Sequence, residues 1–339
     1  MSVTIVFIHL GTKIPRYLKL NLQRTKSLFP ENKVVLVTNI RQKEIKDIIM
    51  FNYSENLETI ELFSHIENDI NMNFRKGYWK FTLQRLFALE FYHAANKSEK
   101  ILHVESDVIL MPNMPFSKFY TIPNICWMRA SPDHDIAALI FSPNSKSTNW
   151  MIECLKTEIL KNFGLSDMKV MSKISHRYPR KVSLLPTLNR ETLRSLYPVN
   201  EFVTNNEKSI LIYGGYFDAL GIGVWNFGLD PRHNFGYTKY FHDFADYYVD
   251  PKEVSLSFSK EKCLVDSLNN SVFSLHIHSK NSKLFSKNWE SEIISILGSP
   301  KKSQTFSLLD LIKTARDYPL RNWFRGTIKY VFKKFVRSL

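Results

Sequence analysis

The first third of the chain alternates between continuous apolar runs and segments with apolar residues at helical spacing. Val3–Leu10 and Lys33–Thr38 are apolar runs of the kind that form strands buried in a parallel sheet. Between them, from Pro15 to Phe29, apolar residues recur every three or four positions, which predicts a helix. Strands and helices that alternate in this way predict an α/β domain with a parallel sheet.

The same reading extends along the chain, with less regularity after residue 110. It predicts a second helix at Ile45–Ile49, a third strand at Leu57–Leu62 and a long helix at Tyr78–Ala95. In the second half it predicts three strands, at Asn124–Arg129, Asp135–Ser142 and Ser271–His278, and two helices, at Thr148–Phe163 and Ser166–Tyr178. Lys181–Asn206 is interpreted as a long connection.

The stretch Lys100–Leu110 is an apolar strand interrupted by two acids, Glu105 and Asp107. Side chains alternate along a strand, so these two carboxylates are expected on one side. Neighbouring carboxylates repel each other unless a cation lies between them, and Mn²⁺ or Mg²⁺ suits such oxygen ligands. An ordinary strand end with exposed acids remains the alternative.

Composition limits the class of protein. The 339 residues include 14% aromatics and 23% charged residues, typical of a folded globular chain. The three cysteines show no metal-finger or paired spacing, which fits a reducing cytosol. The first residues lack the features of a signal peptide, and no apolar run reaches the length of a membrane span. We therefore expect a cytoplasmic protein that is soluble or attached to a membrane surface.

A formal charge of +14 calls for an anionic partner: nucleic acid, an anionic membrane or a phosphorylated substrate. A late strand supplies part of a phosphate site, because His276 and His278 alternate onto one face and Lys280 and Lys283 follow. Imidazoles with carboxylates suit Mn²⁺, and lysines beside them would meet a diphosphate. Arg85, on the helix before the acidic strand, is a further candidate for phosphate contact, or else a solvated helix position.

Three short motifs resemble those of a known family. They are the acid-x-acid strand, the segment Tyr213–Asp218 with Gly228–Arg232 after it, and the ending His276–Lys280 with Lys283–Phe285. In their order along residues 1–295 they resemble nucleotide-sugar-dependent glycosyltransferases of the GT-A fold, most of all bacterial enzymes of capsule or lipopolysaccharide synthesis. The implied fold class is α/β, a GT-A (Rossmann-like) catalytic domain over residues 1–300.

The resemblance also implies roles for residues. Asp107 would bind the metal directly, with Glu105 standing where the family usually has Asp, and His278, with His276 as the alternative, would complete the metal shell. The implied donor-binding residues are Leu10, Gly11, Thr38, Arg85, Ser106, Lys280 and Lys283. The implied reaction moves a hexose from a nucleoside diphosphate sugar, with UDP the first choice, to a saccharide or lipid-linked acceptor.

Two further carboxylates are candidates for the base that deprotonates the acceptor hydroxyl, Asp218 and Asp135. Each has a structural alternative. Asp218 follows two glycines, where a turn or capping role is common, and Asp135 follows the loop sequence Pro132–His134. Asp167 is interpreted as a helix N-terminal residue with a structural role.

Residues 301–339 differ in kind from the rest and are expected to form a helical tail. From Leu320 to Leu339 the chain carries six basic residues and no acid, with aromatic and aliphatic residues on one helical stripe. This pattern predicts a basic amphipathic helix at the inner face of the cell membrane, or else a helix packed on the catalytic domain.

Two other functions fit parts of the sequence. Charge and aromatic content would suit a nucleic-acid-binding protein, but there is no zinc finger or RNP-like strand, and much of the basic excess is C-terminal, so no nucleic acid is expected. A catalytically silent sugar-binding or scaffold protein would be consistent with Glu105 in place of Asp.

Overall fold

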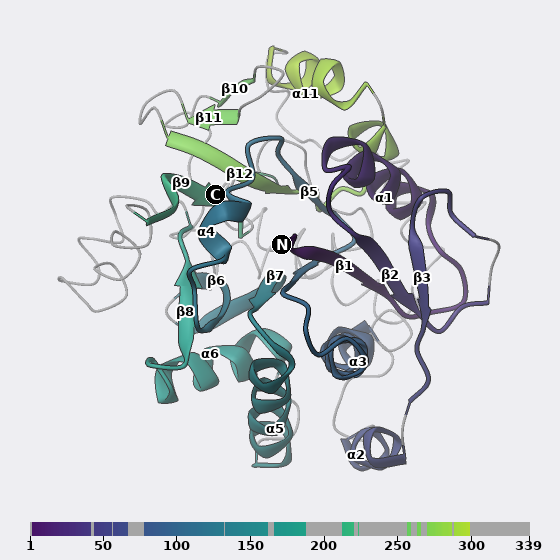
Figure 1. Ribbon diagram of the computed structural model, residues 1–339, viewed down its shortest axis with the longest axis vertical. Coiled ribbons are helices and arrows are strands. Elements are labelled where there is room, and N and C mark those ends of the chain that lie inside the picture. The colour runs from purple at the N-terminus through teal and green to yellow at the C-terminus, as the bar shows by residue number, and fades with distance from the viewer. Residues whose placement is uncertain are drawn as a thin grey trace, which may run out of the picture.

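A computed structural model of the protein places its strands in two sheets with helices packed on both faces of the larger one (Figure 1). The structure describes residues 2–41, 44–55, 57–66, 78–131, 133–161, 166–187, 212–219, 223, 256–258, 263–265, 270–286 and 288–298.

The larger sheet has seven strands, most of them parallel to a neighbour. In spatial order they are β3 (Ile49–Asn52), β2 (Val34–Thr38), β1 (Thr4–His9), β4 (Ile101–Val104), β7 (His134–Ser142), β6 (Ile125–Ser131) and β8 (Val182–Leu185). The first four are parallel, β7 runs antiparallel to β4 and to β6, and β8 is parallel to β6. The carboxyl ends of β1, β2 and β4 therefore meet at one edge.

The smaller sheet is built around one late strand. It contains β10 (Leu256–Phe258), β11 (Cys263–Val265), β12 (Asn270–His276), β5 (Val108–Leu110) and β9 (Gly215–Phe217). β12 is antiparallel to β5 and parallel to β9. Because β5 follows β4 after three residues, this pairing joins the smaller sheet to the edge where β4 ends.

Two buried layers cover the larger sheet. One cluster contains side chains of α1 (Arg16–Leu28) and α4 (Phe116–Phe119), together with Phe217 and Phe273 from the smaller sheet. The other contains side chains of α2 (Leu57–Ile66), α3 (Tyr78–Ala95), α5 (Ser145–Lys161) and α6 (Asp167–Arg177). A third cluster lies under η4 (Ser282–Phe285) and α11 (Trp289–Gly298).

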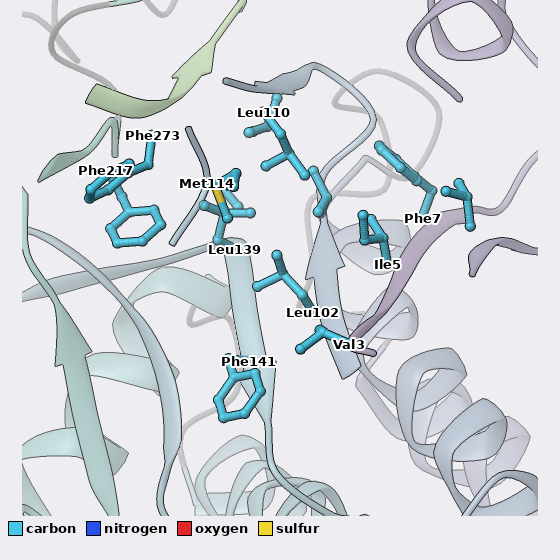
Figure 2. Close-up of a cluster of buried hydrophobic side chains, with 14 of the residues drawn as sticks. Val3, Ile5, Phe7, Leu102, Leu110, Met114, Leu139, Phe141, Phe217 and Phe273 are labelled. Carbon is cyan, nitrogen blue, oxygen red and sulfur yellow. The ribbon is translucent and has the colours of Figure 1, made fainter. Parts of the chain in front are cut away.

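Strand β1 shows why its sequence is apolar throughout. Ile5 and Phe7 pack into the α1 layer, near Leu102 and Leu110 in Figure 2, whereas Val6 and Ile8 pack into the α3 layer. Side chains alternate between the faces of a strand, so a strand covered on both sides needs apolar residues at every position. Burying each such side chain contributes about 1.5–3 kcal/mol before the entropy of ordering is counted.

The predicted alternation is confirmed, with one exchange. The helix predicted around Ile45–Ile49 is wrong, because the chain enters strand β3 at Ile49. The strand predicted at Leu57–Leu62 is also wrong, because this segment lies in helix α2. Short apolar runs fit either period, and here β3 is selected by pairing with β2.

Several predicted features lie outside the described residues: the helical tail at 301–339, the segment Gly228–Arg232 and most of Lys181–Asn206. Residues 182–185 of that last segment form strand β8, where a connection was expected. Among the helices that the structure describes, none combines the length and apolar character needed to cross a bilayer.

Candidate metal centre

The two acids lie in a turn between β4 and β5. The strand predicted across Lys100–Leu110 ends at Val104, and the amide N of Val108 donates a hydrogen bond to the carbonyl O of Glu105 at 3.0 Å. The chain thereby leaves the larger sheet and enters the smaller one. The carboxylates share a side through this turn and not through strand alternation.

Two side chains of helix α1 hold this turn in place. The side-chain amide of Asn21 donates to the carbonyl O of Ser106 at 3.2 Å and to that of Val108 at 2.8 Å. The Tyr17 hydroxyl lies 3.2 Å from the Oγ of Ser106, which was predicted to bind donor. Asn21 is fully buried, and such a polar residue is kept by the hydrogen bonds that it makes. The sequence reading missed Tyr17 and Asn21, which look like ordinary helix positions.

His276 completes a cluster with the two acids. It stands opposite Val108 in the β12–β5 pair, which places it beside the turn. Its Nε2 lies 3.5 Å from Asp107 Oδ1 and 3.7 Å from Glu105 Oε2. One ligand atom from each residue lies within 4.8 Å of the other two. Of the two predicted histidines, His276 is the one that joins this cluster, and the centroids of the two imidazole rings are 5.4 Å apart.

The orientation of His276 is fixed by its neighbours. Its Nδ1 lies 3.0 Å from the carbonyl O of Ala219, so the Nδ1–H can donate there while Nε2 faces the carboxylates. Its backbone N–H donates to Asp218 Oδ2 at 2.9 Å, and Gly223 N donates to the same oxygen at 2.7 Å. A Cβ at Gly223 would lie 2.1 Å from the His276 carbonyl O, so only glycine fits there.

The surroundings of Asp218 favour the turn or capping role that was named as its structural alternative. Asp218 is 2% exposed, and its Oδ2 already accepts two backbone hydrogen bonds. A general base must reach the hydroxyl that it deprotonates, and an enclosed carboxylate of this kind does not. The structure gives Asp218 the role of holding the end of β12 in place.

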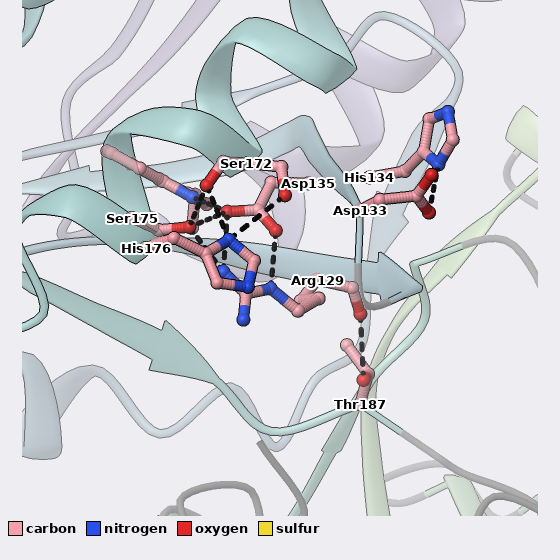
Figure 3. A network of polar contacts seen from close by, with 9 residues as sticks. Arg129, Asp133, His134, Asp135, Ser172, Ser175, His176 and Thr187 are labelled. Carbon is pink, nitrogen blue, oxygen red and sulfur yellow. Dashed lines mark hydrogen bonds and ion pairs between the residues drawn. The ribbon is translucent and has the colours of Figure 1, made fainter. Parts of the chain in front are cut away.

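Asp135, the other predicted base, belongs to a buried network between β6, β7 and α6 (Figure 3). Its carboxylate accepts hydrogen bonds from Arg129 Nε at 2.6 Å, Trp127 Nε1 at 2.7 Å and Ser175 Oγ at 2.6 Å. The side chain is 0% exposed, so a substrate hydroxyl cannot approach it. This corrects the prediction: Asp135 compensates the buried Arg129 charge.

Lys280 lies on the far side of Asp107, with its Nζ 3.4 Å from Oδ2. Its backbone φ is 53°, in the left-handed region that non-glycine residues seldom occupy. Such strain often marks a functional position. Ile277 N donates to the Asp107 carbonyl O at 2.7 Å, and Lys280 N donates to the Ile277 carbonyl O at 3.0 Å. The Lys283 side chain is exposed on η4, one turn further along.

Arg85, predicted at the diphosphate, bridges two carboxylates. It forms an ion pair through Nη1 with Glu105 Oε1, and its Nη2 lies 3.5 Å from Asp167 Oδ2. Burial raises the pKa of Asp167, against the opposing effect of Arg85. Asp167 begins helix α6 as predicted, but its part in this charge network was not predicted.

The electrostatics of the cluster follow from this crowding. Burial alone would raise the pKa of Asp107, but Lys280 and His276 outweigh it and hold that pKa well below its usual range. Burial alone would lower the pKa of His276, but Asp107 and Glu105 raise it to about 9. Two carboxylates thus face a protonated imidazole and an ammonium group. Carboxylate oxygens with one imidazole nitrogen are a donor set that Mn²⁺ accepts and Mg²⁺ tolerates.

The predicted base and ribose contacts lie at the same edge of the larger sheet. Leu10 and Gly11 follow β1, Thr38 ends β2, and Glu105 follows β4. Gly11 N donates to Asn39 Oδ1 at 3.0 Å, which ties the ends of β1 and β2 together. Ligands of open α/β sheets bind beyond the carboxyl ends of the strands, where these residues are found.

Comparison with known proteins gives structural likenesses only. No protein-family model matches the chain, and no curated protein sequence matches it. Among solved structures, the galactosyltransferase LgtC with donor and acceptor sugar analogues is 10% identical, with 61% of this chain and 83% of that one covered, at a TM-score of 0.42. The apo-form glycosyltransferase GlyE of Streptococcus pneumoniae TIGR4 is 13% identical, with 98% and 64% covered, at 0.39. The PaToxG glycosyltransferase is 12% identical, with 63% and 78% covered, at 0.32. Because TM-scores below 0.5 do not establish function, the function of this chain has to be inferred from the site itself.

Proposed function

We propose that the chain is a metal-dependent glycosyltransferase that moves a hexose from a nucleoside diphosphate sugar to a saccharide or lipid-linked acceptor. The observation that carries this is the convergence of Glu105, Asp107 and His276 at the edge where β1, β2 and β4 end. That edge is where nucleotides bind in open α/β sheets, and the donor set suits an ion that also holds phosphates. The family resemblance of the motifs around these three residues supports the same reaction.

Asp107 and His276 would hold the ion directly, with Glu105 contributing through Oε2. Arg85 occupies Glu105 Oε1 and so keeps the other oxygen turned towards His276. When bound, Mn²⁺ or Mg²⁺ would stabilise the negative charge that develops on the departing diphosphate. Lys280, whose Nζ lies 3.4 Å from Asp107 Oδ2, would contact the same diphosphate. Leu10, Gly11 and Thr38 would contact the base and ribose of the donor. UDP remains the first choice for the donor nucleotide.

The substitution Asp107→Asn tests this assignment. It keeps the shape of the side chain and removes the charge, so we expect the affinity for Mn²⁺ to fall at least a hundredfold in calorimetry and Mn²⁺-dependent hydrolysis of UDP sugars to be lost. Asp133→Asn, at a carboxylate that is 74% exposed, is the matched control and should behave as the unmodified chain. Mn²⁺ affinity unchanged in Asp107→Asn would contradict the proposed ligand set, and hydrolysis without any divalent ion would contradict the metal dependence.

The proposed attachment to a membrane surface depends on the C-terminal tail. A lipid-linked acceptor of capsule or lipopolysaccharide synthesis is confined to the inner membrane face, and the basic amphipathic pattern of residues 320–339 is that of a helix lying in the interface. Each basic residue near an anionic surface contributes about 1 kcal/mol. Deletion of residues 318–339 should abolish binding to anionic liposomes at low salt and leave activity on a soluble acceptor largely intact. Equal binding by both forms would refute the role of the tail.

A further inference from the structure

One aromatic side chain of helix α3 is exposed although the helix around it is buried. Phe81 is 39% exposed, and no other residue from there to Leu89 is exposed. Apolar side chains scattered singly over a protein surface are ordinary and need no explanation. Phe81 differs from such cases in the direction that it faces.

The residues that follow Phe81 along the helix show this direction. Ala88 and Tyr92 lie seven and eleven positions after it, which is close to two and three whole turns at about 3.6 residues each. Both are buried, in the same cluster as Val6 of β1 and Val35 of β2. The side of α3 that carries Phe81 is therefore the side that packs on the larger sheet. A residue on this side stays exposed only where the helix extends past the strands.

Arg85 shows that the helix does extend past them. Helix α3 ends at Ala95 and β4 begins at Ile101, so the first turns of α3 lie at the edge where β4 ends. At that edge Arg85 forms its ion pair with Glu105, the residue just after β4. Phe81 lies one turn before Arg85 on the same side of the helix, about 6 Å further along the axis. Its ring is thus beyond the strand ends, next to the candidate metal centre.

The helix is fixed at the point where it presents this ring. Gln84 is 2% exposed, and its Nε2 donates a hydrogen bond to Glu55 Oε1 at 2.7 Å, in the segment that follows β3. Arg85 makes the corresponding contact on the β4 side, through Glu105. An aromatic ring has few rotatable bonds, and on a fixed helix little further order is needed for it to bind a flat ligand surface.

A sugar ring has the surface that such an aromatic side chain binds. The C–H groups of a pyranose form an apolar face, which packs on an aromatic ring and removes apolar area from water, while the hydroxyl groups remain at the rim. In a nucleoside diphosphate sugar, the hexose is bonded directly to the diphosphate that the ion would hold. The hexose is therefore the part of the donor expected beside Arg85 and Phe81, whereas the nucleoside is expected at the ends of β1 and β2.

We propose that Phe81 is a donor-binding residue on whose ring the hexose of the nucleoside diphosphate sugar stacks. This inference rests on the proposed function, because it requires a donor held at the metal centre. It adds an apolar contact to a site whose other groups are mainly charged. The affinity for the donor then depends on the sugar itself as well as on the diphosphate.

Calorimetry on the full chain with Mn²⁺ separates the parts of the donor. The probes are UDP and whichever of UDP-glucose, UDP-galactose and UDP-N-acetylglucosamine binds most tightly. We expect Phe81→Ala to weaken binding of the UDP sugar at least fivefold and to leave the affinity for UDP unchanged. Phe81→Leu, which keeps apolar bulk without a flat face, should show the same loss, and Phe81→Trp should restore binding to within twofold. Leu160→Ala removes an exposed apolar side chain of α5 and is the matched control, for which both affinities should stay unchanged.

The two probes distinguish this inference from the proposed function. If UDP does not bind to the unmodified chain with Mn²⁺, the proposed function is wrong and this inference falls with it. If UDP binds and Phe81→Ala binds the UDP sugar as tightly as the unmodified chain, only this inference is overturned. Equal weakening of UDP and the UDP sugar would also overturn it, because the ring would then contact the nucleoside. Since Ala is the best helix former and Phe81 is exposed, circular dichroism and the urea midpoint of Phe81→Ala should stay unchanged.

Discussion

Replacement of Asp218 by Asn distinguishes the role of a base from the role of a structural anchor. In the structure, the enclosed carboxylate accepts hydrogen bonds from His276 N at 2.9 Å and from Gly223 N at 2.7 Å. Hydrogen bonds to a charged acceptor contribute about 1.5–3 kcal/mol each, and neutral ones about 1 kcal/mol. The amide oxygen of Asn keeps both bonds without the charge. We therefore expect the free energy of unfolding to fall by about 2 kcal/mol.

Urea unfolding followed by circular dichroism measures this loss. With a slope of about 3 kcal/mol per M for a chain of this size, the midpoint should fall by somewhat less than about 1 M. Because Asp218 fixes the end of β12 and thus His276, the affinity for Mn²⁺ should fall in parallel. Asp133→Asn is again the control. If Asp218→Asn unfolded at the unmodified midpoint and bound Mn²⁺ normally, but lost transfer to the acceptor, Asp218 would be the base and our reasoning would be wrong.

Two other substitutions test the charges around the site. Arg85→Gln leaves Glu105 and Asp167 facing each other without their shared cation, so urea unfolding should show a loss of about 3 kcal/mol that Arg85→Lys partly restores; equal stability of all three proteins would contradict the bridge. His103 is buried, with a pKa lowered to about 3 by burial and then by Arg85, so it stays neutral in the fold, while in the unfolded chain it protonates near pH 6.5. The free energy of unfolding therefore falls as the pH drops below 6.5, and His103 accounts for about 2 kcal/mol of that loss at pH 5. In His103→Asn, the free energy of unfolding should differ less between pH 7 and pH 5 by the same amount.

The sequence predicted those parts of the fold in which one period dominates over many residues. The long helix over Tyr78–Ala95 has the predicted bounds, and the apolar runs of β1 and β2 lie where expected. The exchange between Ile45–Ile49 and Leu57–Leu62 occurred where runs are short, at the edge of the sheet. There β3 is chosen by its hydrogen bonds to β2, a tertiary contact that local spacing does not record.

The same distinction applies to the site. An acid-x-acid pair and a late histidine strand are visible as chemistry in the sequence, because carboxylates that interrupt an apolar run stand out. Asn21 and Asp167 are equally close to the site, but they look like a solvated helix position and a helix N-terminus. Their roles arise from contacts with residues more than 80 positions away, since Asn21 bonds to Val108 and Asp167 faces Arg85.

Glu105 shows how one added methylene can link two parts of such a site. The longer side chain places Oε1 at Arg85 while Oε2 stays 3.7 Å from His276 Nε2. Through Arg85 the cluster is connected to Asp167 at the start of α6, so its side chains are held by residues of α3 and α6 as well as by β12. The shorter side chain of Asp would not reach both the guanidinium of Arg85 and the imidazole of His276. The departure from the Asp of the resembling family is thus explained by a second partner and does not by itself indicate a silent site.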